Sequence, residues 1–180
     1  MRSLFGLLLI SLAGLAQEPQ FTKGNRLVRP ADYREWIFLS AGLGMTYGPA
    51  AEGANPDHPR FDNVFVNPRA YKAFLQTGSW PDKTMFVLEV RSSVGKGSIN
   101  NGGHYQDEIL AIESAVKDVS RFPDKWGYFN FGKSGEMTEV LPRSAACYAC
   151  HSKNGAVENT FVQFYPTLLS VAKAKGTLKK

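Results

Sequence analysis

Residues 84–90 read Thr-Met-Phe-Val-Leu-Glu-Val (TMFVLEV) in this chain of 180 residues. A short run that is mostly apolar and rich in Val and Phe predicts a β-strand. Upstream, residues 61–66 (FDNVFV) give a second strand candidate. Between these two runs, Asn67 and Pro68 have the residue types of a helix cap and a first helical position, and Gly78 is a helix stop. The centre of the chain is therefore predicted to be strand, helix, strand.

The remaining candidate elements lie on both sides of this centre. Further strands are expected at residues 35–43, 108–116 and 126–131. For the second of these, a helix over residues 109–116 (ILAIESAV) is the alternative. Helices are expected at residues 144–152 and, broken near Pro166, at residues 160–173. Loops are expected at residues 46–59 and 92–103, and an irregular surface segment at 17–30. This order predicts an α+β fold, mainly an antiparallel sheet with a few helices and a helical C-terminal segment.

The composition is that of an ordinary globular protein, with 43% hydrophobic and 21% charged residues. It excludes a collagen, a coiled coil, a disordered chain and a disulfide-dense mini-protein. The net charge of +5 comes without a long Lys/Arg run, so no nucleic-acid partner is expected. Two cysteines cannot staple a fold of this length, which must depend mainly on its core. The length favours a single domain over residues 17–180.

The first 16 residues have the pattern of a secretory signal peptide. Arg2 precedes the uncharged apolar run of residues 4–15, and Gly14 and Ala16 occupy the −3 and −1 positions of a cut after Ala16. A membrane anchor is the alternative, but the run is too short to cross ~30 Å of hydrocarbon. We therefore expect a signal peptide at residues 1–16, no membrane span and a periplasmic protein.

Both cysteines lie in residues 147–151, Cys-Tyr-Ala-Cys-His (CYACH). C-x-x-C-H is the signature of covalent haem c attachment. In this signature, Cys147 and Cys150 form thioethers with the two vinyl groups of one haem, and His151 binds the iron as the proximal ligand. Export agrees with this prediction, because haem c is attached outside the cytoplasm.

Three other interpretations of the cysteines are weaker. A zinc site needs four ligands, and only His58 and His104 remain beyond the motif. A thioredoxin-like redox pair normally follows the first strand of a βαβ unit, whereas this pair lies near the end of the chain. A disulfide between residues three apart would close a very short loop and stabilise little.

The sixth iron position decides the function of such a haem. Residues 152–180 contain neither Met nor His, so a side-chain ligand would have to come from upstream. The candidates are His58, His104, Met45, Met85 and Met137. His104, in a Gly/Asn-rich loop, is the best of them, but each is more simply explained as a surface or core residue. We therefore expect a five-coordinate or weakly capped iron that can bind small molecules.

The chain resembles the cytochrome P460 and cytochrome c-prime-beta family from about residue 33 to residue 173. The matching stretches are REW at 34–36, VFVNP at 64–68, TGSWPD at 77–82, ESAVKD at 113–118, RF at 121–122, the haem motif, and FYP at 164–166. The resemblance implies a mainly antiparallel β-fold, often dimeric, that holds one haem c with an open distal face. A homodimer is expected from it, and a soluble redox partner is a further candidate partner.

This family contains two chemistries. The P460 enzymes oxidise hydroxylamine and carry a lysine bonded to the haem edge together with a distal carboxylate. The c-prime-beta members lack the cross-link and bind nitric oxide or carbon monoxide in an apolar pocket. The resemblance puts Leu88 at the lysine position, and leucine cannot form the bond. Lys83, at the start of the strand, and Lys96, in the following loop, are poor substitutes.

The resemblance also places Glu113 at the position of the distal carboxylate, as a candidate general base. Alternation sends Ile112 and Glu113 to opposite faces of a strand, so the burial of Glu113 rests on the resemblance. Aromatic side chains are expected around the haem, with Phe86 on the same face as Leu88, and with Phe61 and Phe65 on the neighbouring strand.

Three functions follow. The first is a haem protein that binds nitric oxide or another small ligand. The second is an oxidoreductase that acts on hydroxylamine, with Glu113 as base. The third is an electron-transfer cytochrome with His104 as the sixth ligand.

Overall fold

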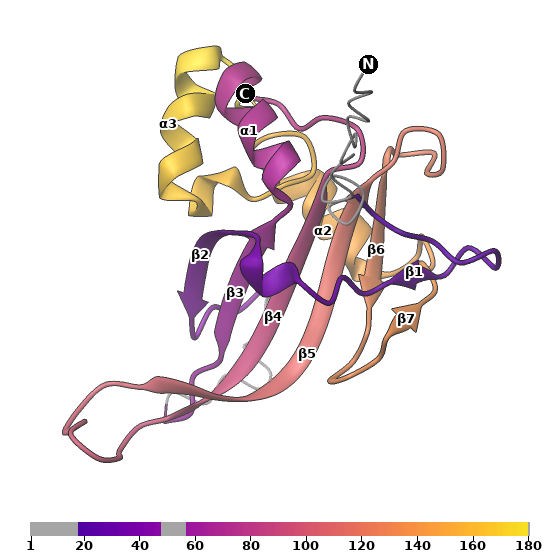
Figure 1. The fold of residues 1–180 in the computed structure, drawn as a ribbon. Coiled ribbons are helices and arrows are strands. Elements are labelled where there is room, and N and C mark those ends of the chain that lie inside the picture. The colour runs from indigo at the N-terminus through magenta and orange to yellow at the C-terminus, as the bar shows by residue number, and fades with distance from the viewer. Residues whose placement is uncertain (1–17, 48–56, 180) are drawn as a thin grey trace, which may run out of the picture.

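The structure is a computed structural model that describes residues 18–47 and 57–179, and the predicted signal peptide at residues 1–16 lies outside them. The described strands form two antiparallel sheets (Figure 1). The larger sheet has the order β2-β3-β4-β5-β6, with β2 at Ile37–Leu43, β3 at Phe61–Val66, β4 at Met85–Val94, β5 at Tyr105–Lys117 and β6 at Trp126–Asn130. The smaller sheet pairs β1 at Leu27–Val28 with β7 at Met137–Thr138. The helices are α1 at Pro68–Thr77, α2 at Ala146–Asn154 and α3 at Pro166–Lys175, with short 3₁₀ turns η2 at Tyr33–Glu35 and η3 at Val162–Phe164. The predicted α+β class is confirmed.

The two central strands of the larger sheet are longer than the sequence predicts. Strand β4 continues through residues 92–94, where a loop is expected, and β5 begins at Tyr105. The segment at 109–116 is strand, not helix, because it pairs along its length with β4 and β6. In Figure 1 the β4–β5 hairpin extends beyond the neighbouring strands. The polar residues of its outer part show no alternation, which explains why the pattern hides them.

Helix α1 begins at Pro68 and ends before Gly78, as predicted. Gly78 has a φ of 73°, a left-handed conformation that favours glycine. Asn67 occupies the cap position, but its side chain does not cap the helix. Its Oδ1 accepts a hydrogen bond from the Met85 N–H at 2.9 Å, and its Nδ2 donates to the Lys83 carbonyl at 3.3 Å. Asn67 therefore ties the start of α1 to the start of β4.

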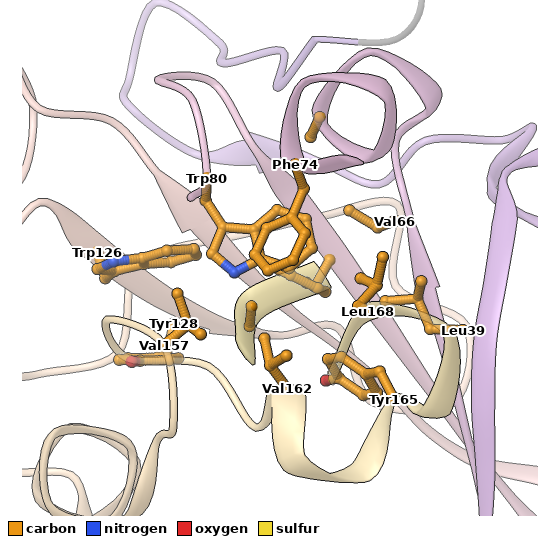
Figure 2. Packing of buried hydrophobic residues seen from close by; sticks show 13 residues of the cluster. Leu39, Val66, Phe74, Trp80, Trp126, Tyr128, Val157, Val162, Tyr165 and Leu168 are labelled. Atoms are coloured by element: carbon orange, nitrogen blue, oxygen red, sulfur yellow. The ribbon is translucent and has the colours of Figure 1, made fainter. Parts of the chain in front are cut away.

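Successive side chains along the strands of the larger sheet point to opposite faces, and each face carries one hydrophobic cluster. In β4, Phe86 joins the cluster beneath α1 and α3, whereas Met85 and Val87 join the other. We call the first the helix-side cluster; it consists of Leu39, Val66, Ala70, Phe74, Trp80, Phe86, Trp126, Tyr128, Val157, Val162, Tyr165, Leu168 and Ala172 (Figure 2). We call the second the opposite cluster; it consists of Leu27, Tyr33, Trp36, Met85, Val87, Ile112, Val116, Phe129 and Phe131.

The C-terminal segment lies on the helix side of the sheet. Helix α2 covers residues 146–154, close to the expected 144–152. Pro166 starts α3 and does not break a longer helix, because proline at the first helical position loses no helical hydrogen bond. Leu168 and Ala172 of α3 are fully buried against α1 and the sheet. This packing fixes the segment that connects α2 to α3.

Strands β1 and β7 were absent from the sequence predictions. Residues 17–30 are expected to be an irregular surface segment, yet Leu27 is fully buried in the opposite cluster. Leu27 and Val28 pair with Thr138 and Met137. Two-residue strands carry too little periodicity for a pattern to reveal them.

Candidate functional site

A cavity of about 470 Å³ lies between the helix-side face of the larger sheet and the C-terminal segment. Its volume falls in the ~300–1,000 Å³ range of pockets that bury small molecules and cofactors. The sheet contributes Ser40, Ala41, Gly42, Asp62, Val64, Phe86, Leu88, Glu113, Ser114, Ala115, Tyr128 and Phe129. The C-terminal segment contributes Leu141, Cys147, Cys150, His151, Asn159, Thr160, Phe161, Phe164 and Tyr165, and Met45 and Tyr47 follow β2.

Helix α2 presents the whole C-x-x-C-H motif to this cavity. Cys147, Cys150 and His151 all line it, because residues three and four apart share one side of a helix. Both cysteines are free thiols. Burial, together with the nearby Glu113 carboxylate, raises the pKa of the Cys147 thiol. The reactive thiol of a redox-active pair shows the opposite shift, so Cys147 lacks the lowered pKa of such a thiol.

His151 is held in the tautomer that a metal ligand requires. Its Nδ1 lies 2.8 Å from the backbone carbonyl oxygen of Asn159, which can only accept, so Nδ1 carries the proton. The lone pair is therefore on Nε2, and the hydrogen bond to Asn159 fixes the ring orientation. The ring packs against Tyr128 and Phe161, with both pairs of centroids 4.5 Å apart. Burial lowers the pKa of His151, which keeps the imidazole neutral.

Gly155 allows the turn that brings Asn159 to His151. A Cβ at Gly155 would lie 2.8 Å from both the His151 carbonyl oxygen and the Thr160 N–H nitrogen, closer than a side chain tolerates. The Trp80 indole N–H donates to the Thr160 hydroxyl at 2.8 Å and ties this turn to the helix-side cluster. Sequence reasoning missed Asn159 and Thr160, and the glycine four residues after the histidine is the signal that could have pointed to them.

The sheet side of the cavity carries an apolar patch. Val64, Phe86 and Leu88 line it together, and the register pairs Val64 with Leu88 across β3 and β4. Leu88 and Phe86 therefore lie on the same side of the sheet and both line the cavity. On the next strand, Leu88 is paired with Glu113.

No lysine lines the cavity among the residues that the structure describes. The Lys83 ammonium lies 2.6 Å from a carboxylate oxygen of Asp118, in the turn region at the start of β4 and the end of β5. Lys96 is exposed in the loop between β4 and β5. Neither side chain reaches the patch around Leu88.

Two carboxyl groups line the cavity, of which the sequence predicted one. Glu113 faces it while Ile112 joins the opposite cluster, and the Asn130 amide donates to Glu113 Oε1 at 3.4 Å. Asp62, which the prediction missed, accepts a hydrogen bond from the Tyr47 hydroxyl at 3.3 Å. Burial raises the pKa of both carboxyls, and the charge of Asp62 raises the pKa of Glu113 further. Both groups therefore keep a proton to higher pH than exposed carboxyls do.

Phe61 and Phe65 do not line the cavity. Because Asp62 and Val64 face it, alternation along β3 places Phe61 and Phe65 on the other face of the sheet. There, Phe65 packs edge-on against Tyr33, with ring centroids 5.7 Å apart. The expectation that these phenylalanines surround the cofactor does not agree with this strand orientation.

The five upstream side chains considered as iron ligands lie in different places. Of these five, only Met45 lines the cavity. His104, the best candidate by sequence, points its Nε2 at the Asp57 carbonyl oxygen at 3.2 Å in the hairpin region. His58 is exposed, Met85 belongs to the opposite cluster and Met137 lies in β7. The geometry therefore gives His104 no part in this site.

The cavity fits the haem that the motif predicts. It brings two thiols and an imidazole with an available Nε2 to one wall, and an apolar patch together with two carboxyl groups to the other. The Tyr128 hydroxyl is buried beside His151 and has no hydrogen-bond partner in the described part of the chain. A buried polar atom of this kind indicates that a bound group supplies the partner. Cys147, Cys150 and His151 are the residues that would hold the haem.

Comparison with models of protein families gives a match to cytochrome P460 over residues 30–162. This match covers more than half of the chain, including the larger sheet and the haem motif. A search of curated proteins gives no match. Over residues 18–47 and 57–179, no helix combines the length and apolar character needed to cross a bilayer.

Proposed function

Because the chain belongs to the cytochrome P460 family, which supports a haem c cytochrome, we propose that it is a periplasmic protein with one covalently held haem that binds nitric oxide or another small ligand. The haem supplies an iron at which such a ligand can exchange. Export is supported by the predicted signal peptide at residues 1–16. The homodimer that the resemblance implies belongs to the same proposal, as does a soluble redox partner.

The observation that carries this proposal is the tautomer and orientation of the His151 imidazole. Its Nδ1–H donates to the Asn159 carbonyl oxygen, so a neutral imidazole directs Nε2 toward a bound iron. Cys147 and Cys150 line the same cavity and supply the attachment points. A histidine that served only as a core residue would not need two thiols beside it.

The apolar patch supports a small, neutral ligand. Val64, Phe86 and Leu88 form an apolar surface on the sheet side of the cavity, next to Asp62 and Glu113, and this surface favours diatomic gases over charged ligands. The leucine at the position of the family's cross-linking lysine agrees with the gas-binding branch of the resemblance.

Intact mass and absorption spectra of the purified holoprotein test this proposal. We expect the mass of the mature chain plus one haem, no red-shifted band of a lysine cross-link, and adducts when the ferrous protein is titrated with carbon monoxide or nitric oxide. His151→Ala should change the spectrum strongly, whereas His104→Ala, a matched control in the hairpin loop, should not. A ferrous protein that forms no adduct with either gas would contradict the proposal.

Oxidation of hydroxylamine is the second candidate, and the two carboxyls in the cavity favour it. Glu113 can accept a proton there, and the pKa shifts predict that its base form appears only at higher pH than for an exposed glutamate. Glu113→Gln should lower turnover by about 10²–10⁴-fold, measured with an electron acceptor. Glu108→Gln, on the exposed part of the same strand, is the control.

The acid side of the pH profile gives an independent check. Asp62→Asn removes a negative charge that raises the pKa of Glu113, so the rise of turnover should move to lower pH. Unchanged turnover in Glu113→Gln would exclude Glu113 as the base.

A further inference from the structure

Met45 lies over the cavity face of β2. Strand β2 ends at Leu43, and Gly44 follows with a φ of 64°, where its N–H donates to the Arg60 carbonyl at 2.8 Å. This left-handed conformation favours glycine. Met45 follows directly and lines the cavity.

The thioether of Met45 occupies space that any side chain at Gly42 would fill. A Cβ built at Gly42 would lie 2.4 Å from Met45 Sδ and 3.7 Å from the Cβ of Asp62. Gly42 pairs with Asp62, and both line the cavity. The sulfur atom is therefore located on the cavity side of the sheet, next to Asp62.

The lone pairs of this sulfur atom are available. The Tyr47 hydroxyl lies 3.8 Å from Met45 Sδ and 3.3 Å from Asp62 Oδ2. A hydroxyl has one proton to donate, and a carboxylate is a stronger acceptor than a thioether. The proton of Tyr47 therefore goes to Asp62 when that group is ionised, and the sulfur keeps both lone pairs.

The other histidine and methionine side chains of the described residues lie outside the cavity. His58, His104, Met85 and Met137 do not line the cavity, which leaves Met45 as the one thioether or imidazole besides His151 that does so among the described residues. Thioethers are established axial ligands of haem c.

We propose that Met45 is a weak, displaceable sixth ligand to the iron that His151 binds. This inference rests on the proposed function and specifies how the distal position is controlled. Met45 Sδ would donate a lone pair to the iron, with no transfer of protons and no change in oxidation state, and an incoming gas would replace it. The side chain is unbranched and flexible, and its sulfur atom lies next to Gly42 and 3.8 Å from the Tyr47 hydroxyl, so it can move aside at little cost.

A displaceable Met45 would make the site selective for ligands that bind the iron more tightly than the thioether does. A gas binds only in the fraction of molecules from which Met45 has departed, so the apparent affinity is reduced by that fraction. Removing the thioether should therefore raise both the rate and the affinity of gas binding.

Spectra and carbon monoxide kinetics of the full haem-loaded protein test this inference. We expect the wild type to be at least partly low-spin, with the long-wavelength sulfur-to-iron charge-transfer band in the ferric state. Met45→Leu should remove that band, make the iron high-spin and accelerate carbon monoxide binding by roughly tenfold or more. Met45→His should restore a low-spin spectrum. Met137→Leu, which changes a methionine in β7, should behave as the wild type.

The outcomes separate this inference from the proposed function. If the wild type is fully high-spin and Met45→Leu binds carbon monoxide at the same rate, Met45 is not a ligand, and gas binding still stands. If neither protein binds carbon monoxide or nitric oxide but Met45→Leu loses a sulfur-to-iron band, Met45 is a ligand and the proposed function fails. If Met45→Leu does not fold, the spectrum of Met45→His is compared with that of the wild type. The same spin state and the same type of iron ligand in both proteins would overturn the inference.

Discussion

At the scale of single residues, the absence of a side chain at Gly42 leaves room in the cavity for the Met45 sulfur atom. Gly42→Ala adds a Cβ where Met45 Sδ now lies, and the far end of a methionine can move aside at little cost. We expect the free energy of unfolding to change by less than about 1 kcal/mol, because alanine in a strand loses less conformational entropy than glycine. Carbon monoxide binding should accelerate as in Met45→Leu.

Urea unfolding and stopped-flow carbon monoxide binding measure these two effects. Gly24→Ala is the matched control, since a Cβ there meets only the Thr22 hydroxyl at 3.8 Å. A loss of several kcal/mol in Gly42→Ala would contradict the prediction, because it would show that the β2 backbone moves and Met45 does not.

The same scale explains which site residues the sequence could reveal. Cys147, Cys150 and His151 are adjacent in the chain, so their spacing alone indicates the chemistry. Asp62 is different, because FDNVFV permits either parity to face the site and only the pairing with β2 and β4 decides it. The partner of His151 is the backbone carbonyl of Asn159, so the type of side chain at residue 159 does not indicate it.

At the scale of elements, the turn between β5 and β6 is organised by one buried carboxylate. Asp118 accepts hydrogen bonds from the Lys83 ammonium at 2.6 Å and the Ser120 hydroxyl at 2.8 Å. Burial alone would raise the pKa of Asp118, but these hydrogen bonds outweigh it and hold the pKa below its ordinary value. The stabilisation is therefore complete above the unfolded pKa of about 3.9 and is lost as the pH falls through the folded pKa.

Asp118→Asn should lower the free energy of unfolding by about 1.5–3 kcal/mol at neutral pH, because it removes hydrogen bonds to a charged group. The difference from the wild type should shrink as the pH falls below about 4. Urea titrations at neutral and acid pH measure it. Asp124→Asn, which alters an exposed pair with Arg143, should change stability by less than about 1 kcal/mol. An equal loss at both pH values would show that the charge of Asp118 is not the cause.

Elements were predictable where local chemistry defines their ends. Helix α1 begins at Pro68, whose ring presets a helical φ, and it ends before Gly78, which has a left-handed φ. Pro166, by contrast, was expected to interrupt a helix that it actually begins, because residues 162–164 form a separate 3₁₀ turn. The outer parts of β4 and β5 were missed because backbone pairing, not core burial, maintains them.

At the scale of the whole molecule, the two clusters depend on the cofactor to different degrees. The opposite cluster, with Leu27 and Ile112 fully buried, lies on the face of the sheet away from the cavity. Helix α2 has no fully buried residue and packs beside the cavity through the haem motif. The sheet should therefore be stable by itself, whereas α2 should need the haem to remain in place.

A chain with Cys147→Ala and Cys150→Ala, purified without haem, tests this dependence. Amide hydrogen exchange should become at least about tenfold faster in residues 146–165, because local opening there no longer disrupts contacts with the haem. Strands β4, β5 and β6 should keep their protection, since their ladders and the opposite cluster remain intact. Ser152→Ala, on the exposed side of α2 with the haem retained, should match the wild type. Uniformly faster exchange throughout the sheet would contradict the prediction and would mean that the haem stabilises the entire fold.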